Sequence, residues 1–528
     1  MNRREFLKAA GAAAATGILA APGIALAQNQ RVLKFVPHAD LAVLDPVFSP
    51  AYVTRHHAYL VFDTLFGMDA NLRPVPQMAE SAGAESDGKV WTIKLRPGLK
   101  FHDGSPVLAR DCVASIRRWA LRDGFGQVLM SVTDDLSAVD DRTLRFRLKT
   151  PFPLLPNALG KVPSFMPAMM PERLAKAEPT TQVTEMIGSG PYRFKLDERV
   201  PGARVVYERF ADYVPRADGA SGWTGGPKVA HFDRIEWVVI PDASTAAAAL
   251  QSGEVDWWEY PLHDLLPMLK RNRNVRVETS EPTGMIPTLR FNTVIKPFDN
   301  PAIRRALLGA VDQEEFMRAQ VGSDASMFRT GVGVFCPGTP MASDAGMEVL
   351  TGPRDYARVK SELEKAGYDG QKIVLLAGVN VADVKNSCDV AAEMMRKVGM
   401  NVDYQALDWG TVIQRRASRE PIENGGWNCY CSSWGGLDQL DPSAHLLLRG
   451  DGGFFGWPKS DELERLRHAW FQAPDLAGQQ AIAAQIQKQA FVDTPYLPLG
   501  QYIQPTAYRS NLAGVKSGFA TFWGVRRA

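Results

Sequence analysis

Residues 372–406, KIVLLAGVNVADVKNSCDVAAEMMRKVGMNVDYQA, decide the class of fold. Their pattern predicts a strand over 372–377, a helix over 383–398 and a second strand over 400–406. Gly399 is well placed to end the helix, because glycine readily adopts the left-handed conformation found there. A strand, a helix and a strand in this order form a β-α-β unit, so the stretch predicts an α/β lobe.

The same alternation continues on both sides of this unit, from about residue 286 onward. Asn300-Pro301 predicts a helix start, because Asn caps the first turn and Pro is favoured at the first helical position. Further helices are expected over 354–366, which Gly367 ends, and over 475–491. Residues before 286 are richer in strands, so the chain changes character there. We expect strands over 31–37, 89–95, 142–148, 204–208 and 235–240, and helices over 52–66 and 109–121.

Length and charge limit what the protein can be. A chain of 528 residues is too long for one core, so two or three lobes are expected. The 60 basic and 58 acidic residues leave a net charge of +2, and the first 27 residues carry that excess. The rest is neutral overall, which argues against a nucleic-acid partner. Hydrophobic residues make up 45% of the chain, enough for a folded core.

Residues 1–27 have the pattern of an export signal. Arg3-Arg4-Glu5-Phe6-Leu7-Lys8 is followed by a short apolar run over 9–21 and by Ala25-Leu26-Ala27, a small-x-small cleavage site. The paired arginines resemble a twin-arginine signal. A membrane anchor is the alternative, but the apolar run falls short of the roughly 20 residues that a span needs. We therefore expect a soluble, exported, periplasmic protein.

Catalytic and metal signatures are absent from the sequence. It has no G-x-S-x-G elbow, no P-loop, no H-E-x-x-H and no cluster with zinc spacing. His56-His57 is an isolated pair, either satisfied by neighbours or in contact with a ligand or metal. The five cysteines are too few for a disulfide scaffold and allow at most one bridge. No cofactor is expected, and binding is favoured over catalysis.

Several segments, in order along the mature chain, resemble one family. They are DANLRPVPQMAES at 69–81, LRPGLKFHDGSP at 95–106, IGSGPYRF at 187–194, LQSGEVD at 250–256, the N-x-x-x-x-P-F-x-x-x-x-x-R-x-A run from Asn292 to Ala306, and ELEKAGY at 362–368. Together they resemble the periplasmic solute-binding proteins of ABC importers, in the dipeptide, oligopeptide and nickel class (extracellular solute-binding family 5).

The resemblance implies a periplasmic-binding-protein-like α/β fold of the three-lobe class II type. Two α/β lobes would close over a solute, and an extra strand-rich lobe would pack beside them. Lobe I would combine 31–60, 186–285 and 495–528, lobe II would be 61–185, and lobe III would be 286–494.

The resemblance also implies where a solute would bind. In peptide binders of the family, an Asp in a W-x-x-D loop of lobe III pairs with the α-amino group of the peptide. Here Trp434 is followed by Asp438 at W-x-x-x-D, one residue later, and then by Asp441-Pro442. A carboxylate in a dry cleft makes a strong charge-assisted bond to an ammonium group. The alternative is that Asp438 is a turn residue and Asp441 caps the next helix.

Other candidates come from aromatic and basic side chains near the expected cleft. Trp434 and Trp427 would line it, although both could be ordinary core residues. Arg290 lies near the expected crossing between lobes I and III and could meet a solute carboxylate. Tyr52 and His56 follow the first strand, a region that reaches the cleft in the family.

The expected function is a receptor that captures a peptide or similar small solute by hinge closure and delivers it to an ABC-type permease. We expect a monomer that performs no chemistry on its ligand. A non-peptide cargo, such as a metal chelate, a glycan fragment or another organic solute, is the alternative within the same role. An enzyme or a structural, chaperone-like protein on a related scaffold remains possible.

Overall fold

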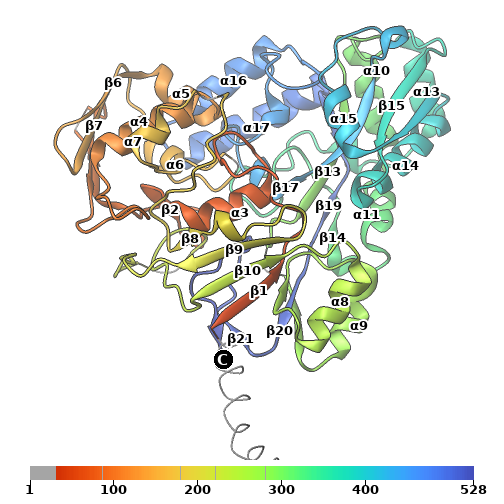
Figure 1. The fold of residues 1–528 in the computed structure, drawn as a ribbon. Coiled ribbons are helices and arrows are strands. Elements are labelled where there is room, and N and C mark those ends of the chain that lie inside the picture. The colour runs from red at the N-terminus through yellow and green to blue at the C-terminus, as the bar shows by residue number, and fades with distance from the viewer. Residues whose placement is uncertain (1–30, 86, 164, 179, 220–221, 280) are drawn as a thin grey trace, which may run out of the picture.

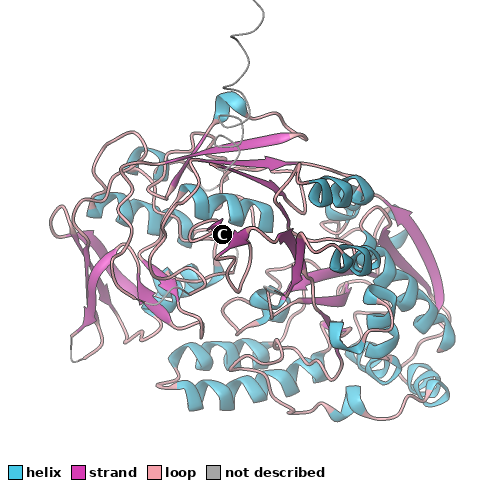
Figure 2. Ribbon diagram, turned by 90° about the horizontal axis from the view of Figure 1, so that it is seen from below, coloured by secondary structure: helices cyan, strands magenta, loops and turns pink. Residues whose placement is uncertain are grey.

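The computed structural model describes residues 31–528 except residues 86, 164, 179, 220–221 and 280. The expected export signal over 1–27 therefore lies outside the described residues. Three separate sheets organise the rest of the chain, each with its own helices (Figures 1 and 2). We call the three parts lobes I, II and III. Within the described residues, no helix combines the length and the apolar character that crossing a bilayer requires.

Lobe I is built on a seven-stranded sheet with β1 near its middle. In spatial order its strands are β12 (Val275–Glu278), β20 (Thr506–Arg509), β11 (Trp257–Trp258), β1 (Val32–Val36), β10 (Arg234–Val238), β9 (Arg204–Arg209) and β8 (Tyr192–Phe194). β1 runs parallel to both β10 and β11. The ends of β1 and β11 therefore open at the same edge of the sheet, which places His38 beside Glu259.

Helix α3 (Tyr52–Val61) begins the connection from lobe I to lobe II. A helix over 52–66 was expected, and this prediction was wrong at its C-terminal end, where β2 (Phe66–Met68) follows. The Gly190 N–H donates to the Val61 carbonyl at 2.9 Å, so the chain from 188 to 190 crosses the last turn of the helix. Only glycine fits there, because a Cβ on Gly188 would lie 2.1 Å from the Val61 oxygen.

Lobe II carries a four-stranded antiparallel sheet in the order β4 (Ala79–Ala84), β5 (Val90–Leu95), β7 (Thr143–Leu148), β6 (Thr133–Ala138). Ile93 and Leu95 point into the core, as their alternation predicted. The helices of this lobe are α4 (Ala109–Ala120), α5 (Gly124–Ser131), α6 (Leu155–Leu159) and α7 (Glu172–Ala175), and a small ladder joins β2 to β3 (Pro74–Pro76).

Lobe III confirms the β-α-β unit from which the fold class was predicted. β15 (Lys372–Gly378), α14 (Ala382–Lys397) and β16 (Asn401–Leu407) follow one another, and the two strands pair in parallel. The whole sheet has the order β14 (Phe328–Arg329), β19 (Gln501–Tyr502), β13 (Met285–Phe291), β17 (Cys429–Gly435), β15, β16, with β18 (Tyr496–Pro498) also paired to β13.

The helices of lobe III pack around this sheet and confirm the expected helix starts. They are α10 (Pro301–Ala306), α11 (Gln313–Val321), α12 (Glu348–Thr351), α13 (Tyr356–Lys365), α14, α15 (Trp409–Arg415), α16 (Asp461–Gln472) and α17 (Leu476–Asp493). The Asn300 side chain accepts from the Ala302 N–H at 2.9 Å and caps α10. Helices α16 and α17 lie side by side and reach toward lobe II (Figure 1).

The C-terminal boundary of lobe III differs from the expected one. The sequence assigned 495–528 to lobe I, but β18 and β19 pair with β13 in the sheet of lobe III. The chain returns to lobe I only after Tyr502, where it forms β20, and it ends in the short ladder of β21 (Leu512–Ala513) with β22 (Arg526–Arg527). Lobes I and III are thus joined by two connections, β12 to β13 and β19 to β20.

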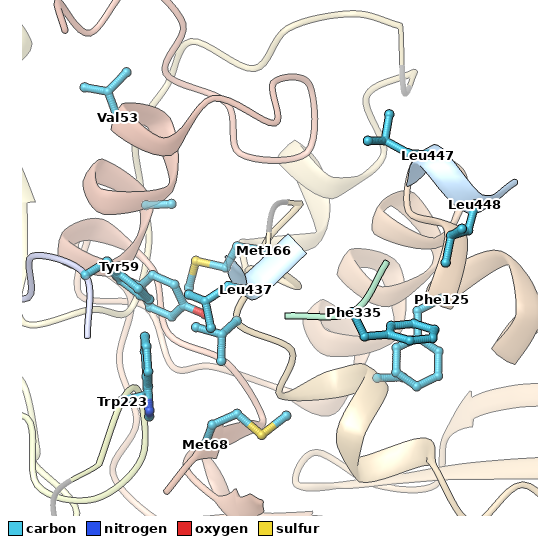
Figure 3. Close-up of a cluster of buried hydrophobic side chains, with 14 of the residues drawn as sticks. Val53, Tyr59, Met68, Phe125, Met166, Trp223, Phe335, Leu437, Leu447 and Leu448 are labelled. Carbon is cyan, nitrogen blue, oxygen red and sulfur yellow. The ribbon is translucent and has the colours of Figure 1, made fainter. Parts of the chain in front are cut away.

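The three lobes are packed together around shared apolar side chains. One core cluster includes Tyr59 of lobe I, Met68 and Met166 of lobe II, and Leu437 of lobe III. Figure 3 shows Leu437 beside Tyr59 and Met166, so side chains from all three lobes meet at this point. All five cysteines are buried and none forms a disulfide.

Candidate ligand-binding site

Lobes I and III make a polar contact directly beside this shared core. Tyr52, in the first turn of α3, donates its hydroxyl to the Asp438 carboxylate in a short hydrogen bond. The same hydroxyl accepts from the Gly435 N–H at 2.6 Å. Asp438 is buried and Tyr52 is half-buried. One phenol thus ties the edge of lobe I to the loop after β17 in lobe III.

The backbone after β17 sets this geometry. A 3-10 turn, η6 (Gly436–Gln439), follows the strand and folds Asp438 back toward Gly435. The Gly436 N–H donates to the Gly284 carbonyl at 2.9 Å, and a Cβ on Gly436 would lie 2.1 Å from the Thr283 oxygen. The glycine pair therefore brings this turn close to the connection between β12 and β13.

Burial controls the charge state of the acids at the contact. Burial raises the pKa of Asp438, against the Tyr52 hydrogen bond and the field of Arg55, which lower it. Burial also raises the pKa of Glu281 to about 7, although Thr283 donates to this carboxylate through both its hydroxyl and its N–H. The pKa of Tyr52 lies well above its usual value through burial and the neighbouring Asp438 carboxylate. Acids held this way are typical of functional sites.

Polar atoms without hydrogen-bond partners gather around the same contact. Among the described residues, the buried atoms Arg55 Nε, Ser433 Oγ and both amide atoms of Gln439 make no hydrogen bond. Leaving such a group buried and unsatisfied costs about 1–3 kcal/mol. Similar atoms occur elsewhere in the described residues, for example Trp237 Nε1 and Arg467 Nε, but those at this contact lie where two lobes meet and are available to a ligand that enters between them.

His38, His56 and Glu259 form the donor set best suited to a metal. One ligand atom from each lies within 4.8 Å of the others. Their contacts with one another and with Arg55, however, form an internal chain, in which the His56–Glu259 link is an approach of two atoms without hydrogen-bond geometry. The Arg55 Nη2 atom lies 3.3 Å from His56 Nε2 and can only donate, so the neutral ring carries its proton on Nδ1, 3.1 Å from Glu259. His38 Nδ1 and its backbone N–H both lie within 2.9 Å of the other Glu259 oxygen.

The protonation states fit this chain. Burial lowers the pKa of His56 to about 4, which keeps the ring neutral at pH 7. The two histidines hold the pKa of Glu259 well below its usual range, although burial opposes them. A metal at His56 Nδ1 would have to displace a proton that the Arg55 hydrogen bond fixes there. The three residues therefore fit a structural network better than a metal centre.

Four of the residues expected at the site lie at or near this contact. Tyr52 and Asp438 form it, and His56 lies one helical turn from Tyr52. Trp434 directly precedes Gly435, with its ring half-buried against Phe454 and its Nε1 donating to Ser432 Oγ at 3.0 Å. Asp441 instead has a capping role, as the alternative held, but it caps a turn and not a helix. Its carboxylate accepts from Ser443 and Ala444 and caps the following turn.

Two expected site residues are core residues instead. Trp427 is fully buried in a cluster with Tyr430 and Trp457, and its Nε1 donates to the Ser418 carbonyl at 3.1 Å. Arg290 is also fully buried, and its guanidinium donates to the carbonyls of Leu447 and Phe455 at 2.9 Å. Both side chains are engaged inside lobe III, Arg290 from strand β13 and Trp427 from the segment just before β17. The expectation that they line the cleft is corrected accordingly.

Three further charged residues of the contact were not expected from the sequence: Arg55, Glu259 and Glu281. Arg55 lies three residues after Tyr52, so helical spacing would have placed both on one face. Glu259 follows the apolar pair Trp257-Trp258 at a strand end, where binding residues often gather. Glu281 lies in a connection between lobes and carries no sequence signal.

Comparisons with known proteins agree with this architecture. A model of the family "Bacterial extracellular solute-binding proteins, family 5 Middle" matches residues 73–454. A probable peptide ABC transporter periplasmic-binding protein of Sinorhizobium fredii is 37% identical over the full length of both chains. A glutathione-binding protein of Pectobacterium atrosepticum is 28% identical and covers 74% of this chain and 72% of its own.

Solved structures show the same fold at lower identity. The periplasmic binding protein DppA of Helicobacter pylori, in complex with the peptide STSA, superposes with a TM-score of 0.78 at 21% identity. The match covers 95% of this chain and 99% of the other. The family match spans most of the chain, and the full-length relative is well above 30% identical. This chain belongs to family 5 of the bacterial extracellular solute-binding proteins.

Proposed function

We propose that the protein is a peptide receptor of an ABC importer, and that Asp438 binds the α-amino group of the peptide. The observation that carries the proposal is the Asp438 carboxylate itself. It is buried at the contact between lobes I and III, and its hydrogen-bond partner there is a neutral phenol from the opposite lobe. The proposal is supported by the peptide-binding description of the full-length relative.

In this mechanism an ammonium group of the ligand replaces the Tyr52 hydroxyl as the hydrogen-bond donor to the Asp438 carboxylate. When the lobes open about the two connections between them, Tyr52 leaves Asp438. An ammonium group then approaches the carboxylate, and closure buries the charge pair, which strengthens it. Half-buried Trp434, beside Gly435, would form part of the wall around the peptide. Tyr52, which now bridges the lobes, would contact the bound peptide.

Calorimetric titration with short peptides tests the proposal. Peptides with a free amino terminus should bind, and their N-acetylated forms should bind much more weakly. Asp438→Asn should lower the affinity for free peptides by at least about 30-fold, since removing one partner of a buried charge pair costs about 2–5 kcal/mol. Asp355→Asn, a helix cap on the surface of lobe III, is the matched control. Equal affinity for free and acetylated peptides would contradict the role of Asp438.

The proposed role also requires export to the periplasm, with residues 1–27 as a twin-arginine signal. Arg3 and Arg4 are the pair that this route would read. A reporter fused to residues 1–30 should be exported, and changing both arginines to Lys should abolish export. Export that survives the double change would assign the signal to the general secretory route.

We further propose that the receptor acts as a monomer, delivers its ligand to membrane permease subunits and leaves it chemically unchanged. Membership of a solute-binding family supports binding over catalysis. Light scattering on the purified protein should give the mass of one chain. Mass spectrometry of bound peptide after long incubation should return the peptide intact, whereas cleaved products would favour an enzyme.

A further inference from the structure

Arg55 is a buried cation at the boundary between the lobes. Its side chain projects from α3 and is only 5% exposed. The guanidinium lies 4.9 Å from the ring centre of Tyr52 and 4.2 Å from that of Phe519. Tyr52 therefore contacts both groups, with the guanidinium of Arg55 over its ring and the carboxylate of Asp438 at its hydroxyl.

No carboxylate neutralises this cation. Among the described residues, none places an acidic oxygen within 4.0 Å of the Arg55 guanidinium, and Arg55 Nε makes no hydrogen bond. Its Nη2 donates to a neutral ring, that of His56, at 3.3 Å. Arg118 of lobe II differs, because it is similarly buried but holds Asp45 through two bonds of 2.7 and 3.2 Å. The fully buried Arg290 has no acid within reach among the described residues either, but it donates to the carbonyls of Leu447 and Phe455. A buried charge without such a partner is costly.

The nearby acids do not fill the role of a partner. Glu281 and Asp438 both feel the field of Arg55, which lowers their pKa, but burial dominates and raises both. Glu281 is engaged by Thr283 and Asp438 by Tyr52. Glu259 is engaged by His38 and His56. The fork of Arg55 thus keeps donor capacity for an oxyanion brought in from outside.

We propose that Arg55 binds the carboxylate of the ligand, so that the preferred ligands are short peptides with both termini free. This inference rests on the proposed function and deepens it. Asp438 would hold the ammonium end from lobe III, and Arg55 the carboxylate end from lobe I. Each lobe then contributes one charge, and a ligand that carries both opposite charges completes the closed form.

The test compares matched peptide pools on the full mature protein. Dipeptides and tripeptides are titrated calorimetrically as free acids and as C-terminal amides, both with free amino termini. The free acids should bind about 10- to 100-fold more tightly than the amides, the range expected for a charge-assisted bidentate contact. This comparison needs no variant, so it does not depend on any substituted protein folding.

Variants then assign the effect to one residue. Arg55→Gln should remove the preference for the free acid, so that free acids and amides bind this variant with equal affinity. Arg55→Lys keeps the charge without the fork, so it should retain part of the preference. Arg416→Gln is the matched control, because Arg416 also lies over two aromatic rings, Phe455 at 4.5 Å and Tyr430 at 5.7 Å, in the Trp427 cluster of lobe III.

The outcomes separate the two proposals. If acids and amides bind wild-type protein equally, the inference about Arg55 is overturned while the peptide receptor stands. A preference for acids that survives in Arg55→Gln also overturns it, because another residue must then hold the carboxylate. If no pool binds, the proposed function fails, and the inference fails with it. A preference for acids that is lost in Arg55→Gln and kept in Arg416→Gln supports both.

Discussion

At the scale of single residues, the candidate site is defined by charges whose hydrogen bonds are incomplete or come from neutral partners. Asp438 is held by a phenol, Glu281 by a threonine, and Arg55 by a neutral imidazole. Burial works against the charged form of each acid, because transfer from water into a low-dielectric interior is costly. The protein thereby stores an unfavourable electrostatic energy that a complementary ligand would relieve.

The electrostatic cost of burying Glu281 should appear as a pH dependence of the unfolding free energy. Its pKa is about 7 in the folded protein and near 4.5 without burial, so the folded state binds more protons between these values. The unfolding free energy should therefore fall as pH rises from about 4.5 to 7. Glu281→Gln has no carboxyl group at this position, so its unfolding free energy should not show this decrease. The difference in unfolding free energy between the two proteins should grow by up to roughly 3 kcal/mol across this range.

Urea denaturation of both proteins at several pH values checks this expectation. His56 acts in the opposite direction, since its pKa of about 4 makes stability rise with pH, but it is present in both proteins and cancels in the difference. A difference that does not change with pH would show that Glu281 is ionised normally in the folded protein.

Arg290 provides a contrasting case, a buried arginine whose role is structural. Its guanidinium donates to the carbonyls of Leu447 and Phe455, and replacing it with Met would leave these acceptors unsatisfied. Arg290→Met should lower the unfolding free energy by about 3 kcal/mol. Peptide affinity, measured well below the unfolding transition, should not change. A large loss of affinity with normal stability would restore Arg290 to the site.

At the scale of elements, the position of α3 decides which side chains reach the contact. The helix carries both Tyr52 and Arg55, and its C-terminal end is fixed by the segment 188–190. The sequence IGSGPYRF, which helped to identify the family, thus has a packing role. Its two glycines let the backbone cross directly over the carbonyls of Leu60 and Val61.

Gly188→Ala tests this role. The added Cβ would lie 2.1 Å from the Val61 oxygen, so the helix or the crossing segment has to move. We expect a loss of about 1–3 kcal/mol in unfolding free energy, together with weaker peptide binding as Tyr52 and Arg55 shift. Gly83→Ala is the control, since a Cβ there meets nothing within 4 Å, and it should be nearly neutral. Normal stability of Gly188→Ala would mean that the crossing tolerates a side chain.

At the scale of the whole molecule, lobes I and III are joined by two connections and bridged by the contact of Tyr52 with Asp438 and Gly435. Two connections allow hinge motion, and a contact made in the closed form alone shifts the balance between open and closed forms. The Tyr52 hydroxyl is therefore the natural place to change that balance without touching either core.

Tyr52→Phe should open the ligand-free protein. It removes one donor and one acceptor from the contact, and each 1.4 kcal/mol lost changes the ratio of closed to open forms tenfold. Spin labels at Ser252 on α8 (Ala243–Ser252) and Glu393 on α14, both exposed, would report the distance between the lobes. Because the five native cysteines are buried, the introduced labelling sites should react selectively.

The distance distribution should broaden toward longer values in Tyr52→Phe and narrow again when peptide is added. Tyr404→Phe, on β16 and bonded to Asp389 within lobe III, is a matched loss of one phenol hydroxyl and should leave the distribution unchanged. Identical distributions for wild type and Tyr52→Phe would show that the hydroxyl does not hold the lobes together.

The sequence by itself determined the family and most of the elements. Hydrophobic periodicity located β15, α14 and β16 to within one residue, and caps such as Asn300 located helix starts, because both signals act between residues close in the chain. These are the features that short-range physics fixes. Family likeness predicted Tyr52 and Asp438 near the cleft, and the structure brings these two side chains into contact.

Only the tertiary structure decided how distant segments meet. It ended α3 at Val61, because Gly190 binds that carbonyl, and it placed β18 and β19 in lobe III by pairing them with β13. It buried Arg290 and Trp427 in cores, and it placed no carboxylate of the described residues within ion-pair distance of Arg55. Whether a charged side chain is neutralised depends on groups far away in sequence, which no local pattern records.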